Sequence, residues 1–239
     1  MIELIPKIIH YCWFGKNPMP KYVHKCIQSW KKFCPDFQII RWDETNYDIE
    51  KNEFVRQAYS AKKWAFVSDY ARIDILYNHG GIYLDTDVEL LKSLNFLLTE
   101  EAYFGIQQDG CFVNTGLGFG SVQFHPILKK MLDEYNSLEF NLSQFQNLAC
   151  PYINTKILSE VGFQSKNELQ NLQTVTIYPA KYFDPISTNA LNLLCEESVS
   201  IHHYGGAWLS KGNGLKRRLY MFIGEKRIIK LKRILKWKK

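Results

Sequence analysis

Two aspartates separated by one residue are the first feature of the sequence that could do chemistry. Asp85 and Asp87 lie in Ile-Tyr-Leu-Asp-Thr-Asp-Val, residues 82–88, a short segment rich in strand-forming residues. Side chains of a strand alternate between its faces, so both carboxylates would point the same way. Two adjacent negative charges favour a bound cation, and carboxylate oxygens suit Mg²⁺ or Mn²⁺, which keep open positions for a diphosphate. The pair therefore predicts a metal–phosphate site, although a solvated strand end would give the same triplet.

A second charged pair precedes the aspartates. Asp69 and Arg72 lie three positions apart in residues 64–78, where apolar residues recur at helical spacing. Both side chains therefore lie on one face of a predicted helix. Asn-His-Gly-Gly, residues 78–81, supplies a glycine stop directly before the acidic segment. Taken alone, this pair also fits a surface ion pair.

The two pairs together resemble a known family. Ser-Asp-x-x-Arg, residues 68–72, followed by Gly-Gly-Ile-Tyr-x-Asp-x-Asp, residues 80–87, is similar to the DXD sugar-binding region of family 32 glycosyltransferases. That family includes bacterial capsular-polysaccharide and lipopolysaccharide sugar transferases, yeast-type initiating mannosyltransferases and, more distantly, the glucosyltransferase domain of large clostridial toxins. The resemblance implies an α/β chain of the glycosyltransferase-A type, with a Rossmann-like, mostly parallel central sheet flanked by helices.

The resemblance also implies roles for individual residues. Asp85 and Asp87 would hold Mn²⁺ (or Mg²⁺), Tyr83 would lie in the donor site, and Asp69 and Arg72 would position the sugar of a nucleotide-sugar donor. The implied reaction retains the anomeric configuration. No carboxylate stands out as a covalent nucleophile, so we expect front-face attack by the acceptor hydroxyl, with the leaving nucleoside diphosphate stabilised electrostatically.

Two further segments resemble parts of the donor site. Residues 5–13 are similar to the family's opening strand, and by that match Trp13 would stack on the donor base, although a lone tryptophan after a strand is otherwise a core residue. Asn114 lies in a segment like the strand and loop beneath the sugar, where its amide would hold sugar hydroxyls, or it is simply a turn asparagine before Gly116. Cys150 replaces the glycine of the family's Gly-Pro pair, and no role is carried over to it.

A loop near the end of the sequence resembles the family's closing segment. His202 or His203 would be a metal ligand, because neutral imidazole binds Mn²⁺, and the resemblance favours His202. Trp208, Ser210 and Lys211 would close over the diphosphate, with Lys211 offsetting its charge. On its own, such a lysine is usually only solvated.

An α/β framework is predicted around these residues. Apolar runs, helical periodicity and glycine or proline turns indicate a β-α-β opening and alternating elements after it. The predicted strands are 7–14, 38–42, 82–88, 103–107, 111–119, 175–178 and 199–202, and the predicted helices are 22–33, 64–78, 126–135 and 153–161.

The 46% hydrophobic content of the 239 residues indicates a globular protein. Charge is distributed unevenly along the sequence. Residues 211–239 carry twelve Lys or Arg and one Glu, whereas residues 1–210 carry 18 Lys or Arg and 23 Asp or Glu. We expect a catalytic domain over residues 1–212 and a basic tail over 213–239. Within residues 224–239, Ile228, Leu231, Ile234 and Leu235 share about one third of a helical wheel, with Ile229 and Trp237 outside it, which predicts an amphipathic helix on an anionic membrane surface. A disordered solubilising tail or a basic arm for nucleic acid would also fit.

The acidic body argues against nucleic acid as a partner. The first residues lack the features of a signal peptide, and the six cysteines form no CxxC pair, so we expect a cytoplasmic protein, peripheral on the inner face of the membrane.

The predicted activity is transfer of a hexose, from UDP-galactose or UDP-glucose, to a hydroxyl of a glycan acceptor, expected to be lipid-linked, in bacterial surface polysaccharide synthesis. The alternatives are a nucleotidyltransferase and a non-catalytic nucleotide-binding module at the membrane.

Overall fold

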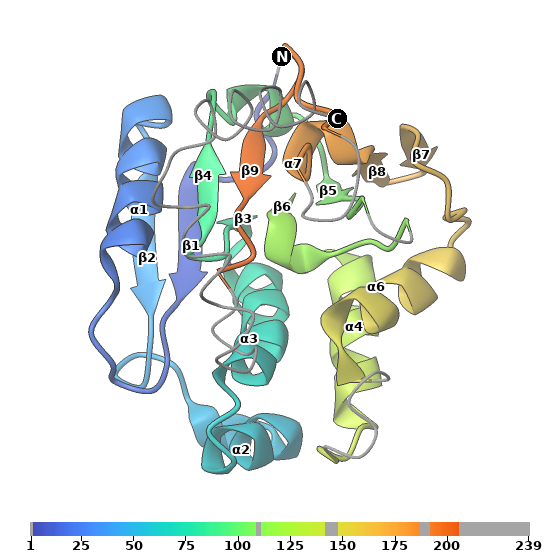
Figure 1. The fold of residues 1–239 in the computed structure, drawn as a ribbon. Coiled ribbons are helices and arrows are strands. Elements are labelled where there is room, and N and C mark those ends of the chain that lie inside the picture. Colours follow the sequence, from blue (N-terminus) through green and yellow to red (C-terminus); the bar gives the residue numbers. More distant parts are fainter. Residues whose placement is uncertain (1, 109–110, 142–147, 187–191, 206–239) are drawn as a thin grey trace, which may run out of the picture. The chain divides into compact units, whose positions relative to one another are not determined.

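The structure is a computed structural model that describes residues 2–108, 111–141, 148–186 and 192–205. The chain separates into one compact unit over Met1–His202 and a second over His203–Lys239. All helices and strands named below belong to the first unit (Figure 1). The predicted boundary between residues 212 and 213 lies outside the described residues and stays a prediction. Within the described residues, no helix combines the length and the apolar character that crossing a bilayer requires.

The chain opens with the β-α-β unit that the sequence predicts. Strand β1 (Ile8–Cys12) leads through helix α1 (Lys21–Phe33) to strand β2 (Gln38–Trp42). The two strands pair in parallel over their whole length, with Ile8 opposite Gln38 and Cys12 opposite Trp42. This prediction is confirmed.

The central sheet has seven strands in the order β2-β1-β3-β6-β5-β8-β7. The α/β class is confirmed, and the sheet is mixed: β1–β2, β1–β3 and β5–β8 pair in parallel, whereas β3–β6, β5–β6 and β7–β8 are antiparallel. The parallel strands β2, β1 and β3 are adjacent, so their carboxyl ends share one edge. The remaining strands of the sheet are β3 (Gly81–Tyr83), β5 (Ala102–Gly105), β6 (Phe119–Ser121), β7 (Gln170–Leu172) and β8 (Val175–Tyr178).

Helices cover both faces of the sheet. The side chains of β1 alternate between the two faces, so successive residues of this strand pack against different helices. Tyr11 packs edge-on against Trp30 of α1, whereas Cys12 belongs to the apolar core that α3 completes on the opposite face. Helix α3 contacts β1, β3 and β6, and it also packs against α2 and α4 (Figure 1). The helices on this side are α2 (Glu53–Ser60), α3 (Trp64–His79), α4 (Pro126–Asn136) and α6 (Cys150–Ser159).

Two glycines make the sharp connection from α3 to β3. Gly80 and Gly81 have φ of +64° and +101°, the left-handed region that glycine adopts without strain. A Cβ on Gly81 would lie 2.9 Å from the Ile8 carbonyl oxygen, so the close approach of β3 to β1 also requires glycine. The predicted glycine stop therefore ends α3 and directs the following residues along β1.

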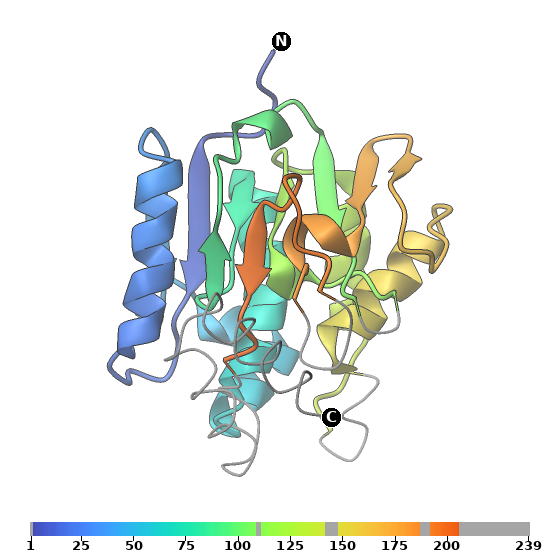
Figure 2. The same ribbon diagram turned by 45° about the horizontal axis from the view of Figure 1, so that its top comes forward.

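Two predicted strands differ from the structure. Residues 111–119 do not form one strand: they contain the short 3₁₀ helix η3 (Thr115–Leu117), capped by the Asn114 side chain, before β6 begins at Phe119. Residues 82–88 do not form one strand: β3 ends at Tyr83, and β4 (Val88–Leu90) pairs with β9 (Ser200–His202) in a separate two-stranded ribbon (Figure 2). The remaining short elements are η1 (Ile49–Lys51), η2 (Asn95–Leu97) and α7 (Ala180–Phe183).

Candidate functional site

The two aspartates lie in a turn and not, as predicted, on a strand. The Val88 N–H donates to the Asp85 carbonyl at 3.0 Å, which closes a turn between β3 and β4. Aspartate favours turns because its short side chain hydrogen-bonds nearby backbone, so the Asp-Thr-Asp sequence interrupts the run of strand formers. Both aspartates nevertheless follow the carboxyl end of β3, and both are partly buried.

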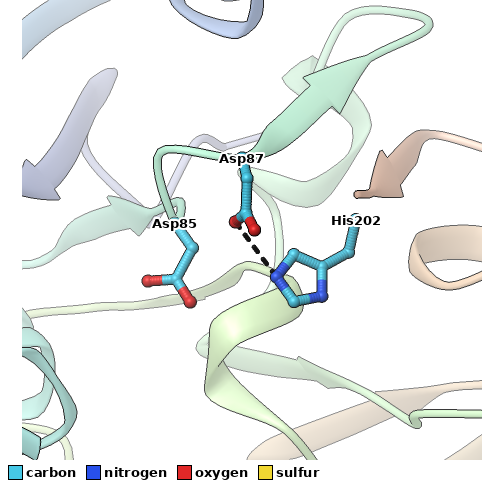
Figure 3. A group of neighbouring side chains, drawn as sticks. All are labelled: Asp85, Asp87 and His202. Atoms are coloured by element: carbon cyan, nitrogen blue, oxygen red, sulfur yellow. Dashed lines mark ion pairs between the residues drawn. The ribbon is translucent and has the colours of Figure 1, made fainter. Parts of the chain in front are cut away.

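His202 completes a group of three potential metal ligands. The antiparallel register of β4 and β9 sets His202 opposite Val88, the residue after Asp87. His202 Nε2 lies 3.1 Å from Asp87 Oδ1 (Figure 3). One ligand atom from each of Asp85, Asp87 and His202 lies within 4.8 Å of the other two. Two carboxylates and an imidazole form a donor set that fits Mn²⁺ or Mg²⁺, and of the two adjacent histidines His202 is the one in the group.

Burial and neighbouring charges shift the titration of these ligands. Burial raises the pKa of Asp85, with Arg72 opposing and Asp87 adding to the rise. Burial alone would lower the pKa of His202, but Asp87, Asp85 and Asp184 raise it above its ordinary value. The neighbouring carboxylates thus favour the protonated form of His202, and a metal ion would compete with that proton for the imidazole.

Arg72 joins the helical pair to the acidic turn. Its Nη2 lies 3.0 Å from Asp69 Oδ1 and 3.1 Å from Asp85 Oδ1. Asp69 and Arg72 are only 7% and 3% exposed, which excludes the surface ion pair that spacing alone allows. The Tyr83 hydroxyl donates to Asp85 Oδ1 at 3.1 Å, and the Arg72 guanidinium stacks over the Tyr83 ring at 5.0 Å. Asp69, Arg72, Tyr83 and Asp85 thus form one buried network.

Asn114 lies beside this network, but its amide already has partners. Its Oδ1 accepts the Gly116 N–H at 2.8 Å, and its Nδ2 donates to Gln107 Oε1 at 3.0 Å. These bonds give Asn114 the turn-capping function considered as the alternative, and its contact with a sugar stays a prediction. A Cβ on Gly116 would lie 2.7 Å from Asp85 Oδ2, so the η3 backbone lies directly against the acidic turn.

Sequence patterns missed three residues around the network, Thr115, Cys150 and Asn154. Arg72 Nη1 lies 3.5 Å from Thr115 Oγ1 and 3.9 Å from Cys150 Sγ. Asn154, one turn along α6 from Cys150, donates to Thr115 Oγ1 at 3.0 Å. The Cys-Pro pair at the start of α6 was a visible signal, but only the fold brings α6 to Arg72.

Trp13 follows β1 at the same sheet edge as the acidic turn. The Leu84 N–H donates to the His10 carbonyl at 3.0 Å, so β1 and β3 run in register to their carboxyl ends. Trp13 is half-buried, and its indole N–H donates to the Asn17 carbonyl at 2.7 Å. Ligands of open α/β sheets bind at this end of the strands, so the position is compatible with a nucleotide platform. That role stays a prediction.

The remaining predicted donor-site residues, Trp208, Ser210 and Lys211, lie outside the described residues, as does the tail over residues 224–239. Their predicted contacts therefore stay predictions.

The sequence is similar to that of known sugar transferases. Residues 20–104 match the glycosyltransferase sugar-binding region containing DXD motif. The chain is 28% identical over 145 residues to inositol phosphoceramide mannosyltransferase 3 of Schizosaccharomyces pombe, covering 57% of this chain and 39% of that protein. It is 26% identical over 163 residues to the human alpha-1,4-N-acetylglucosaminyltransferase, covering 66% of this chain and 42% of that protein. The chain therefore spans less than half the length of these two relatives.

Solved structures support the fold. PaToxG glycosyltransferase superimposes with a TM-score of 0.54 and 22% identity, over 66% of this chain and 69% of that one. A glycosyltransferase involved in glycosylation of the major capsid of PBCV-1 superimposes with a TM-score of 0.52 and 13% identity, over 92% of this chain and 100% of that one. Residues 20–104 thus resemble the sugar-binding region of family 32 glycosyltransferases, and the fold is of the glycosyltransferase-A type.

Proposed function

We propose that this sugar transferase moves a hexose from a nucleotide-sugar donor to a hydroxyl of a glycan acceptor, with a divalent cation held by Asp85, Asp87 and His202. The observation that carries the proposal is the convergence of these three ligands beside the buried Asp69–Arg72 pair. Carboxylate and imidazole ligands suit Mn²⁺, and a site of this kind leaves positions open for a diphosphate.

The bound cation supplies positive charge against the charge that grows on the departing nucleoside diphosphate. The chain's own residues do the positioning. Arg72 and Tyr83 both contact Asp85 Oδ1, so that Asp85 keeps a single orientation. Asp69 and Arg72 orient the donor sugar, and Trp13 covers the base. Lys211, with Trp208 and Ser210, closes over the diphosphate and adds a second positive charge.

The proposed reaction retains configuration through front-face attack. The acceptor hydroxyl approaches from the side on which the diphosphate leaves, so no covalent intermediate with the enzyme is needed. Positioning of both substrates and stabilisation of the leaving group then account for the rate acceleration.

UDP-galactose and UDP-glucose are the proposed donors, and the names of the relatives add mannose and N-acetylglucosamine to the sugars worth testing. A lipid-linked acceptor at the cytoplasmic face of the membrane, in bacterial surface polysaccharide synthesis, fits the basic residues 224–239, which we propose contact anionic lipid. The name of the S. pombe relative, which includes a ceramide lipid, is consistent with such an acceptor.

The test is a panel of UDP- and GDP-sugars incubated with the purified protein, with and without Mn²⁺, with release of free nucleoside diphosphate as the readout. Mn²⁺-dependent release from one donor is expected and would identify the sugar. If no donor reacts, calorimetric titration with UDP, GDP and Mn²⁺ distinguishes a strict requirement for acceptor from the absence of a nucleotide site. Absence of nucleotide binding in the presence of Mn²⁺ would refute the proposal.

A further inference from the structure

Cys150 contacts three polar residues of the candidate sugar site at once. Its Sγ lies 3.5 Å from Asn114 Oδ1 and 3.9 Å from Arg72 Nη1. Its thiol and its backbone N–H also lie close enough to the Asp69 carboxylate to lower the pKa of Asp69, against the effect of burial. All four residues are at most 7% exposed, so water cannot easily replace a lost contact. One small side chain therefore connects the helical charged pair to the loop that carries Asn114.

The position of Cys150 in α6 explains why it points at Asp69. Cys150 is the first residue of the helix, and the preceding residue, Ala149, gives no side-chain cap. The Asp69 carboxylate lies near this uncapped helix end, where the helix dipole favours negative charge. One turn later Asn154 bonds Thr115, which in turn lies next to Arg72. This face of α6 thus holds the charged pair at two successive turns.

We propose that Cys150 is a positioning residue of the donor-sugar site: its S–H donates to Asn114 Oδ1 while its sulfur lies against Arg72, so that Arg72 holds Asp69 and Asp85 in one geometry. The inference rests on the proposed function, because it assigns Asp69 and Arg72 to the sugar. Burial raises the pKa of the Cys150 thiol well above its ordinary value, so the thiol stays protonated and available as a donor.

A purely structural explanation exists, since buried cysteine often serves as a small apolar residue. The two explanations differ in what a substitution does. Loss of packing lowers stability and affects every ligand alike. Loss of the S–H donor lowers the affinity for the nucleotide-sugar but not for the nucleoside diphosphate, and a hydroxyl in its place restores that affinity.

The experiment compares Cys150→Ala, Cys150→Ser and the control Cys34→Ala, which removes an equally buried thiol at the end of α1. Each variant is titrated with UDP and with UDP-glucose in the presence of Mn²⁺; if the donor panel selects another nucleotide-sugar, that sugar and its nucleoside diphosphate are used instead. We also measure kcat/KM and the melting temperature. Cys150→Ala should lose about tenfold in kcat/KM and in affinity for the nucleotide-sugar, with the affinity for UDP within about twofold of wild type. Cys150→Ser should recover most of the loss.

The inference is overturned if Cys150→Ala keeps wild-type kcat/KM, if it weakens UDP as much as UDP-glucose, or if Cys34→Ala has the same effect. Should Cys150→Ala fail to fold, Cys150→Val replaces it, because valine fills the volume and cannot donate. A wild-type protein that binds neither UDP nor UDP-glucose refutes the proposed function itself. If wild type binds both ligands and Cys150→Ala binds them with the same affinities, only the inference about Cys150 is refuted.

Discussion

His202 Nε2 lies 3.1 Å from Asp87 Oδ1, although one residue ends the last strand of the first unit and the other precedes β4. The antiparallel ribbon of β4 and β9 creates this contact, since its register sets His202 opposite Val88. The candidate metal site therefore depends on long-range pairing and not only on the Asp-Thr-Asp turn. It forms only when the segment around residue 200 is folded against β4.

Asp87→Asn should abolish Mn²⁺-dependent turnover, by more than about a hundredfold, because an amide oxygen replaces one anionic ligand. The melting temperature without metal should change little, since the Asp87 side chain is 16% exposed and the substitution also removes repulsion from Asp85. Turnover and thermal melting check the two statements. Asp133→Asn, which removes an exposed carboxylate of α4, is the matched control. A collapsed fold in Asp87→Asn would instead make Asp87 structural.

Arg72→Ala should destabilise the protein by about 3–5 kcal/mol, because it leaves the buried Asp69 and the partly buried Asp85 carboxylate without their shared counter-charge. Urea unfolding in EDTA measures the loss. Arg56→Ala, which breaks an exposed ion pair with Glu53, should cost no more than about 1 kcal/mol. Added Mn²⁺ should recover part of the loss in Arg72→Ala, since the cation takes over neutralisation of Asp85. Equal stability of the two variants would contradict the bridging role of Arg72.

The sequence is sufficient to predict the β-α-β opening, α3 and its glycine stop. Each is encoded locally: β1 is largely apolar, β2 carries Ile39, Ile40 and Trp42, and α3 combines helical periodicity with Gly80 and Gly81. The prediction of a single strand over residues 82–88 is wrong for a definable reason. Strand formers flank the Asp-Thr-Asp turn on both sides, so one strand of seven residues and two strands of three share the same pattern, and only pairing with different partners separates them.

Site residues that belong to a sequence motif can be predicted, whereas those that reach the site only through packing of distant helices cannot. Asp69, Arg72, Asp85 and His202 were identified from the pattern, and the structure brings them to adjoining positions. Cys150 could not be assigned from the sequence, because its contacts with Asp69, Arg72 and Asn114 arise from helix packing between distant segments.

Asp69 should make the stability depend on pH. Burial raises its pKa to about 6, an effect that Arg72 and Cys150 oppose and Asp85 adds to, with Tyr135 of α4 also close. Because this pKa lies above that of the unfolded chain, the fold favours the protonated form, and the contribution of Asp69 to stability falls as pH rises from about 4 through 6. The free energy of unfolding of wild type relative to Asp69→Asn should therefore fall by about 2 kcal/mol between pH 4.5 and 7.5.

Urea titrations of both proteins in EDTA at the two pH values measure this difference. The subtraction removes the contribution of groups that titrate alike in wild type and variant. A difference that is constant with pH would place the pKa of Asp69 near that of the unfolded chain and contradict the role of burial.

Trp13→Ala should weaken UDP binding by about tenfold or more, because a base stacked on an aromatic ring contributes about 1–3 kcal/mol. Calorimetry with UDP and Mn²⁺ gives the affinity. Phe96→Ala removes an exposed aromatic ring on η2 and should leave the affinity unchanged. Unchanged UDP affinity in Trp13→Ala would remove Trp13 from the base site while leaving the metal ligands untouched.

Deletion of residues 224–239 should release the protein from anionic liposomes and spare hydrolysis of the donor. The segment carries eight Lys or Arg and one Glu, and each basic residue near anionic lipid contributes about 1 kcal/mol. Co-sedimentation with phosphatidylserine-containing and phosphatidylcholine vesicles, at low and high salt, separates electrostatic from apolar attraction. Replacing Lys236, Lys238 and Lys239 by glutamate should weaken binding while keeping the apolar residues. If the truncated protein still sediments with anionic vesicles, the membrane contact lies elsewhere in the chain, and the lipid-linked acceptor loses its main support.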